Sequence, residues 1–291
     1  MLAQFVQFLL SGITIGSTYA LAALGFSIIY NASGVINFAQ GEFIMLGGMA
    51  AAVLVASGIP LPLAILAAVA IAGVIGLIVE KLAIEPAKNA EVVTLIIITI
   101  GASLFLRGLV QVWLGKGTRA LPPFSGENPL EILGATMLPQ SLWVLGVTLL
   151  VVIVLAWFFN HTLFGKAMLA TSHNKLAAQL VGINTKMILM VSFGLAAALG
   201  AVGGIIIAPI TNTSYDIGVM LGLKGFVAAT LGGLGSGTGA IVGGLLLGVV
   251  EAMTAGYVSS AYKDAVPFVL ILLILFFMPR GLFGAKVTER V

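Results

Sequence analysis

Long apolar runs separated by short polar stretches make up most of this chain. A helix of ~20 apolar residues crosses the ~30 Å hydrocarbon layer of a bilayer. Nine runs approach that length, and the seventh is short and broken by glycine: 5–30, 43–59, 61–80, 92–114, 141–159, 187–208, 220–234, 238–256 and 265–279. The pattern predicts an all-α polytopic membrane protein with about eight or nine transmembrane helices, forming a single transmembrane domain over 1–291.

A polar segment at 161–186 separates the fifth and sixth apolar runs. Ser172 or Asn174 can accept hydrogen bonds from the first free amides of a short helix, and Gly182 can take the left-handed position at its end. Leu176, Leu180 and Ile183 give that helix a narrow apolar stripe. Two helical turns are marginal alone in water, so we expect this segment to dock against another protein.

The other long connection covers 115–140 and contains Pro122, Pro123, Pro129 and Pro139. Prolines restrict the backbone, so we expect an ordered loop here, on the opposite side of the membrane from 161–186.

Composition supports the membrane class. Of the 291 residues, 60% are hydrophobic and 8% are charged, whereas a soluble domain has about 25% charged residues. The formal charge of +3 is small and scattered, which argues against a nucleic-acid partner. The chain has no cysteine, so it forms neither disulfides nor thiolate metal sites. The first residues lack a basic region, and we interpret them as the approach to the first span and not as a cleaved signal.

Basic residues predict the orientation, because Lys and Arg collect in short cytoplasmic loops. If 161–186 is cytoplasmic, alternation places 80–91 and the C-terminal tail on the same side. Eight basic residues then lie inside: Lys81, Lys88, Lys166, Lys175, Lys186, Arg280, Lys286 and Arg290. Three lie outside: Lys116, Arg119 and Lys263. The N-terminus is therefore expected outside and the C-terminus in the cytoplasm, with an odd number of crossings.

Glycines recur at four-residue spacing in three series, which lets helix backbones approach closely. They form Gly12-x3-Gly16, Gly235-x3-Gly239-x3-Gly243 and Gly244-x3-Gly248. Such faces occur in ordinary membrane helix packing, around translocation paths and at subunit interfaces.

Motifs for catalysis are missing from the sequence. Gly115-Lys-Gly-Thr118 lacks the earlier glycine and the Ser/Thr of a phosphate-binding loop. His161 and His173 have no carboxylate nearby in sequence, and no hydrolase motif is present. We therefore expect no catalytic residue, no metal site, no cofactor and no ATPase activity of its own.

Ionisable residues at membrane depth are costly and are functional candidates by default. Glu42 opens the second span, where its charge favours a helix N-terminus. Arg107 lies within the fourth span and could pair with Glu251 of the eighth. Lys224 lies towards the outer end of the seventh span, where snorkelling to the interface would explain it.

Three blocks of sequence resemble the permease subunits of branched-chain amino-acid ATP-binding-cassette (ABC) importers. They are Asn31-Ala-Ser-Gly-Val-Ile-Asn-Phe-Ala-Gln-Gly-Glu-Phe-Ile-Met-Leu-Gly47, the glycine-rich stretch from Gly222 to Ser236 with Gly243–Glu251, and Met278-Pro-Arg-Gly-Leu-Phe-Gly284. The chain is most similar to the shorter of two paralogous permeases. The resemblance implies a multi-pass protein of the bacterial inner membrane that passes amino acids by alternating access.

The same resemblance implies its partners: a paralogous second permease, two ABC ATPase subunits and a periplasmic substrate-binding protein. It implies that 166–184 is the segment that couples to the ATPase. Ala177-Ala178-x3-Gly182 keeps the small-residue core of the importer motif, whereas Leu176 replaces its usual glutamate and Lys166 stands where arginine is usual. The residues expected to make this contact are Lys166, His173, Asn174, Lys175, Ala177, Ala178, Leu180 and Gly182.

A permease that receives its substrate from a binding protein needs only a weakly polar path. Eight residues are expected to line it: Asn37, Gln40, Glu42, Thr99, Ser103, Arg107, Thr230 and Glu251. Leucine, isoleucine and valine are the default substrates, with urea or short amides as the alternative within the same family. A stand-alone secondary transporter is the alternative of a different class, but it would be expected to show half-repeats or intramembrane carboxylates for ion coupling.

Overall fold

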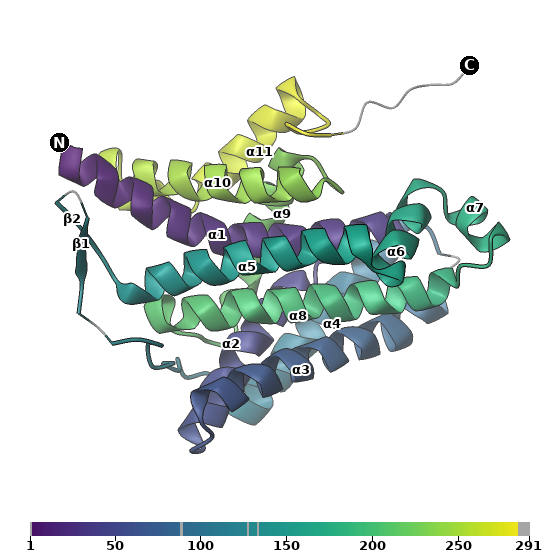
Figure 1. The fold of residues 1–291 in the computed structure, drawn as a ribbon, viewed down its shortest axis with the longest axis horizontal. Coiled ribbons are helices and arrows are strands. Elements are labelled where there is room, and N and C mark those ends of the chain that lie inside the picture. The colour runs from purple at the N-terminus through teal and green to yellow at the C-terminus, as the bar shows by residue number, and fades with distance from the viewer. Residues whose placement is uncertain (1, 88–89, 127, 133, 285–291) are drawn as a thin grey trace.

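The computed structural model describes residues 2–87, 90–126, 128–132 and 134–284. Most of its helices run along the long axis of one bundle (Figure 1). The helices are α1 (Leu2–Ser33), α2 (Gln40–Ala56), α3 (Leu61–Val79), α4 (Val92–Leu114), α5 (Pro139–His161), α6 (Leu163–His173), α7 (Lys175–Leu180), α8 (Thr185–Thr211), α9 (Ile217–Gly232), α10 (Gly237–Tyr257) and α11 (Val266–Phe277). A π-helical turn at Glu80–Ile84 and a 3-10 turn at Glu85–Ala87 follow α3.

The apolar runs become helices close to their expected bounds. Within the described residues, six helices are long and apolar enough to cross a membrane, and α2, α9 and α11 are shorter apolar helices. The short seventh run is α9, of 16 residues. The protein is therefore a helical, multi-pass membrane protein, as predicted.

One small sheet departs from the all-α prediction. Strands β1 (Leu130–Ile132) and β2 (Ala135–Met137) pair antiparallel in the 115–140 loop. The hairpin is fastened to α1, because the Gln7 side chain donates to the carbonyl of Thr136 (2.8 Å) and accepts from its amide (2.7 Å). Short alternating stretches within a loop give too weak a signal to be recognised beside 20-residue apolar runs.

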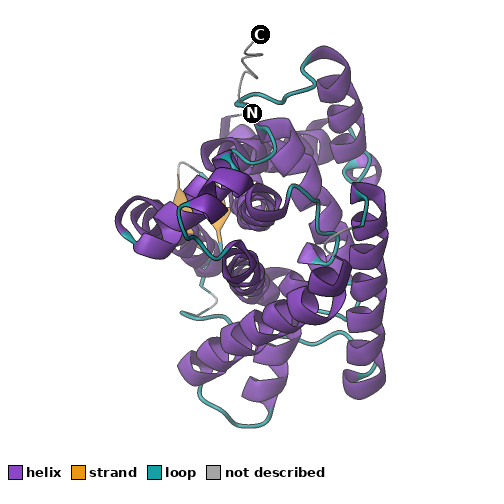
Figure 2. Cartoon of the chain, turned by 90° about the vertical axis from the view of Figure 1, so that its right-hand side faces the viewer, coloured by secondary structure: helices purple, strands orange, loops and turns teal. Residues whose placement is uncertain are grey.

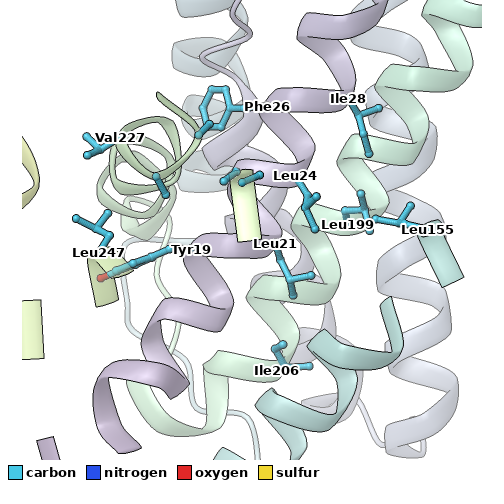
Figure 3. Close-up of a cluster of buried hydrophobic side chains, with 14 of the residues drawn as sticks. Tyr19, Leu21, Leu24, Phe26, Ile28, Leu155, Leu199, Ile206, Val227 and Leu247 are labelled. Carbon is cyan, nitrogen blue, oxygen red and sulfur yellow. The ribbon is translucent and has the colours of Figure 1, made fainter. Parts of the chain in front are cut away.

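The helices α1 and α8 form the centre of the bundle. In the most apolar window of α1, 89% of residues are buried, against 17% for α5 on the periphery. A large apolar cluster forms around α1. Figure 3 shows α1 side chains of this cluster together with side chains from α5, α8, α9 and α10. Tyr19 belongs to this cluster and lies beside Leu247 (Figure 3).

The glycine faces pack helices within this chain. A Cβ on Gly16 would lie 2.8 Å from the Gly244 carbonyl oxygen, and one on Gly248 would overlap the backbone of Gly16. On its other face α10 meets α9, where a Cβ on Gly243 would overlap the Ala228 carbonyl. The glycine series therefore serve close helix packing, α10 against α1 and α10 against α9.

The polar segments gather at the two ends of the bundle. The hairpin and the N-terminus share one end, and α6 and α7 lie at the other (Figure 1). The Lys186 ammonium lies 3.9 Å from the Glu85 carboxylate, so the turn after α3 is at the α7 end. The backbone amides of Leu282 and Phe283 donate to the carbonyls of Leu231 and Gly232 at the end of α9. Just after them in sequence, the Gly235 carbonyl accepts from the Asn31 side chain of α1. Lys88, Lys286 and Arg290 lie outside the described residues.

Candidate functional site

The segment 161–186, called the docking segment below, leaves α5 through a sharp turn. Thr162 ends α5 and caps α6, because its hydroxyl oxygen accepts from the Gly165 amide (3.0 Å). Gly165 lies so close to α5 that a Cβ there would overlap the Phe158 carbonyl. The helix α6 is therefore folded back onto the end of α5. The sequence analysis predicted one short helix in this segment, so α6 is a second helix that was not predicted.

The short helix α7 begins and ends as its sequence predicts. The Asn174 side chain accepts from the amides of Leu176 and Ala177, both at 3.0 Å. Gly182 has φ +90°, in the left-handed region, and its amide bonds the Gln179 carbonyl (3.0 Å). The predicted cap and the predicted terminus are both confirmed.

Exposure divides the apolar stripe of α7. The side chains of Leu176 and Leu180 are 69% and 81% exposed, and Val181 is 77% exposed. Ile183 packs on the core and Ala178 is buried. Among the other residues expected to contact the ATPase, Lys166, His173, Asn174, Lys175, Ala177 and Gly182 are exposed. The docking segment thus presents apolar side chains and basic groups together on an uncovered surface.

One small cavity brings the docking segment next to residues expected in the path. Lys175 of α7, Asn37 of the 34–39 link and Thr99 of α4 all line a cavity of about 50 Å³. The Thr99 hydroxyl accepts from the Phe38 amide (3.2 Å) and so ties the link to α4. The Asn37 Oδ1 accepts from the Ala39 amide, whereas its buried Nδ2 has no partner among the described residues.

Glu42 lies in the first turn of α2, as predicted, and a second polar group surrounds it. Its Oε1 accepts from the Ser103 hydroxyl (2.8 Å) and lies 3.8 Å from Arg107 Nε. Oε2 is buried without a hydrogen-bond partner among the described residues. The Arg107 side chain is 25% exposed and the Glu42 side chain 1%. Arg107 therefore has its counter-charge on α2.

The expected pairing of Arg107 with Glu251 is wrong, because Glu251 belongs to a third group. Lys224 Nζ donates to Glu251 Oε1 (2.7 Å) and to Asp264 Oδ1 (2.7 Å). The Tyr19 hydroxyl donates to Glu251 Oε2 (2.9 Å). The snorkelling explanation for Lys224 is also wrong, since its side chain is only 6% exposed and lies between two carboxylates. The pairing of Lys224 with Glu251 results from the packing of α9 on α10, and residue spacing along the sequence does not reveal that packing.

The two remaining residues expected in the path, Gln40 and Thr230, form hydrogen bonds inside the bundle. Gln40 is fully buried and donates to the Ala196 carbonyl (3.0 Å), between Gly25 of α1 and Gly200 of α8. The Thr230 hydroxyl donates to the carbonyl of its own helix at Phe226 (2.9 Å). Of the eight expected path residues, all except Arg107 are buried.

Two residues of the Lys224 group were missed from the sequence. Tyr19 lies in the interior of an apolar span, where a side chain with a hydroxyl needs a partner, and this signal could have identified it. Asp264 lies just before an apolar run and looks like an ordinary loop residue. Only its contact with Lys224 shows that it faces the bundle.

Comparison with known proteins places these features in a family. The family model described as "Branched-chain amino acid transport system / permease component" matches residues 8–275. The chain belongs to this family. Its members are transport permeases and not enzymes, in agreement with the resemblance drawn from the sequence blocks.

The relatives match along nearly the whole permease. The high-affinity branched-chain amino acid transport system permease protein LivH of Salmonella typhimurium is 37% identical over 303 residues, covering 99% of this chain and 98% of LivH. BraD of Pseudomonas aeruginosa, with the same description, is 35% identical over 304 residues, covering 99% and 98%. The solved structure of PsaBC from Streptococcus pneumoniae in complex with Fab shares the fold, with a TM-score of 0.53, 15% identity, and coverage of 96% and 97%.

Proposed function

We propose that this permease is one of two membrane-spanning subunits of an ATP-driven importer in the bacterial inner (cytoplasmic) membrane. A periplasmic binding protein delivers leucine, isoleucine or valine, and the permease passes it by alternating access. A paralogous permease completes the pore, and two separate ATPase subunits supply the energy. The observation that carries the proposal is the uncovered docking segment at one end of the bundle.

The docking segment has the properties of a contact surface for a soluble protein. A helix of six residues is marginal on its own, yet α7 is held by the Asn174 cap and by buried Ala178. Leu176, Leu180 and Val181 nevertheless remain exposed. An apolar patch rimmed by basic side chains is typical of a site that a partner covers. The ATPase subunits are the partners that the family supplies.

Charge supports the cytoplasmic position of this end. Four basic residues lie at the α7 end: Lys81 in the turn after α3, Lys166 on α6, Lys175 on α7 and Lys186 at the start of α8. The 115–140 loop at the other end carries Lys116 and Arg119. Basic residues collect on the cytoplasmic side. We place the N-terminus outside and the C-terminal end inside, because Leu282 and Phe283 bond the end of α9 near Gly235, which contacts Asn31 at the inner end of α1.

The small cavity suggests how the ATPase moves the permease. Lys175 of the docking segment faces the same cavity as Asn37 and Thr99, and Thr99 holds the 34–39 link through the Phe38 amide. A shift of α7 on its partner would therefore press directly on the link between α1 and α2. That link leads directly into α2, so Gln40 and Glu42 in its first turn would move with it.

The proposal is tested by the same substitution at two exposed alanines. The permease is co-expressed with its partner subunits, purified, and reconstituted into liposomes with the binding protein, and ATP-driven leucine uptake is measured. Ala177→Trp places a bulky ring on the exposed face of α7, while Ala120→Trp does so in the opposite loop.

We expect ATP-dependent uptake by the wild type, loss of uptake and of retained ATPase subunits in Ala177→Trp, and normal uptake in Ala120→Trp. Normal transport by Ala177→Trp would remove α7 from the ATPase contact. Uptake driven by an ion gradient without ATP would instead make this chain a secondary transporter.

A further inference from the structure

The connection between α10 and α11, residues 258–265, is irregular and polar. It contains a 3-10 turn at Ser260–Tyr262, capped where the Ser259 hydroxyl accepts from the Ala261 amide (3.3 Å). Tyr262 is 63% exposed, and Ser260 and Lys263 are exposed as well. Asp264 follows, and its side chain is 45% exposed although Oδ1 is bound to Lys224.

The connection begins at the outer end of α1, because the Tyr257 ring just before it packs against Phe8, and hydrogen bonds show that its last part reaches into the membrane. Tyr19 lies 17 residues after the first residue of α1 and 14 before the last, so it is near the middle of that span (19 − 2 and 33 − 19). From Tyr19 the chain of bonds runs to Glu251, then to Lys224, then to Asp264, with no step longer than 2.9 Å. The Asp264 carboxylate therefore lies below the outer end of α1, in the outer part of the membrane.

The neighbouring helix α5 gives the same depth scale. Gln7 of α1 bonds Thr136 just before α5 begins, and Asn31 of α1 lines a cavity with Phe159 near the end of α5. The two helices therefore cross the membrane side by side. Leu150, the midpoint of α5, lies at a level close to Tyr19 and faces outward, 59% exposed.

The helix α11 starts at this depth and does not cover the connection. Its 12 residues reach about 18 Å, too short to cross the hydrocarbon layer. In Figure 1 α11 tilts away from the bundle, and Figure 2 shows the molecule from its α7 end, with the helices seen nearly end-on. Ser260, Tyr262 and Lys263 are thus uncovered on the chain by itself.

Lipid cannot cover such a segment. Irregular backbone at membrane depth occurs only where it is buried in protein or lines a water-filled cavity, because unpaired backbone groups have no partner in hydrocarbon. Charged side chains follow the same rule. A protein–protein contact is the poorer explanation, since charged residues are depleted from the cores of interfaces, and Lys263 and Asp264 are adjacent here.

We propose that the connection 258–265 lines the water-filled, outer part of the translocation path. Lys263 presents an ammonium group and Asp264 a half-exposed carboxylate, which match the carboxylate and ammonium of a zwitterionic amino acid. Lys224 positions Asp264 by holding its other side to α9. This inference rests on the proposed transport function and adds the surface that the substrate meets inside the membrane.

Single cysteines test the location, and the chain has none of its own. Ser260→Cys and Tyr262→Cys are made in the complete reconstituted importer and treated with a charged, membrane-impermeant thiol reagent. Ser57→Cys, in the exposed turn after α2, is the matched positive control, and Leu150→Cys is the control at lipid-facing mid-depth. Labelling rates are compared without nucleotide and with the ATPases trapped by ATP and vanadate.

We expect both connection cysteines to react at rates approaching that of Ser57→Cys in one state and clearly more slowly in the other. Ser57→Cys should react equally in both states, and Leu150→Cys should not react. Rates as low as that of Leu150→Cys in both states would mean that protein covers the connection, and rates equal in both states would place it on the outer surface. Either result overturns the proposal.

Charge substitution tests the role of Lys263. Lys263→Ala should lower the maximal rate of leucine uptake by about fivefold, the effect of one solvated charge–charge contact at ~4 Å. Lys263→Arg should restore it, and ATPase subunits should remain bound in both variants. Equal uptake by Lys263→Ala and wild type would overturn the charge role.

The wild-type complex separates the two proposals. ATP-driven uptake by the wild type with an unreactive connection refutes only the path assignment. A connection that reacts as expected in a complex that never transports amino acids refutes the proposed function and leaves the water-filled surface in place.

Discussion

Replacing Lys224 by methionine should destabilise the permease more than any other single change in its buried ion cluster. Lys224 is the only cation between Glu251 and Asp264 in the described contacts, so the cluster carries one positive and two negative groups. Methionine keeps the length and apolar body of the lysine stem but removes the charge. Two carboxylates then remain without their counter-charge, and Glu251 is 8% exposed.

The structure sets the order of the effects. Removing one partner of a buried ion pair costs about 3–5 kcal/mol, which we expect for Lys224→Met. Glu251→Gln leaves the Lys224–Asp264 pair intact and keeps an acceptor for Tyr19. Its cost should be about 1 kcal/mol, within the range of single hydrogen bonds between membrane helices. The double variant should be more stable than Lys224→Met alone, because it no longer buries an unpaired carboxylate.

The assay is equilibrium unfolding of the full chain in mixed micelles, followed by the fluorescence of its three tryptophans. Lys224→Met, Glu251→Gln and the double variant are compared as a double-mutant cycle. A Lys224→Met variant no less stable than Glu251→Gln, or a double variant less stable than both, would refute the charge accounting for this cluster.

Three further predictions follow from single contacts. Gly204→Ala should lower the free energy of unfolding by about 1–3 kcal/mol, because its Cβ would overlap a carbonyl of α2. Gly101→Ala, whose Cβ meets open space, should not lower it in the same assay. Equal effects of the two substitutions would show that α2 moves aside easily. Asn174→Ala removes both cap bonds of α7, which should cost about 1 kcal/mol of helix stability, and it should reduce the leucine transported per ATP hydrolysed. Asn174→Asp keeps an acceptor and should preserve this ratio. An unchanged ratio in the alanine variant would show that the cap plays no part in coupling. Glu42→Gln should lower the free energy of unfolding by about 1–3 kcal/mol, since Arg107 then lacks the carboxylate that balances its charge. A variant as stable as the wild type would show that water already screens the Glu42–Arg107 pair.

The membrane class, the approximate helix bounds and the form of α7 could all be predicted from the order of residues. Each depends on neighbours along the chain. A run of apolar residues forms a helix wherever it enters hydrocarbon, because backbone groups must bond within the segment. Asn174 and Gly182 act on amides and carbonyls within a few residues of themselves, so their roles are visible without the fold.

The polar partners inside the bundle could be identified only from the folded chain. Tyr19 meets Glu251 across 232 residues of sequence, and Lys224 meets Asp264 across 40. These pairs depend on the depth and rotation at which α1, α9 and α10 pack, and glycine faces set that packing through backbone contact. Residue spacing along one chain contains no measure of depth on another helix, which is why Arg107 was paired with the wrong carboxylate and Asp264 was overlooked.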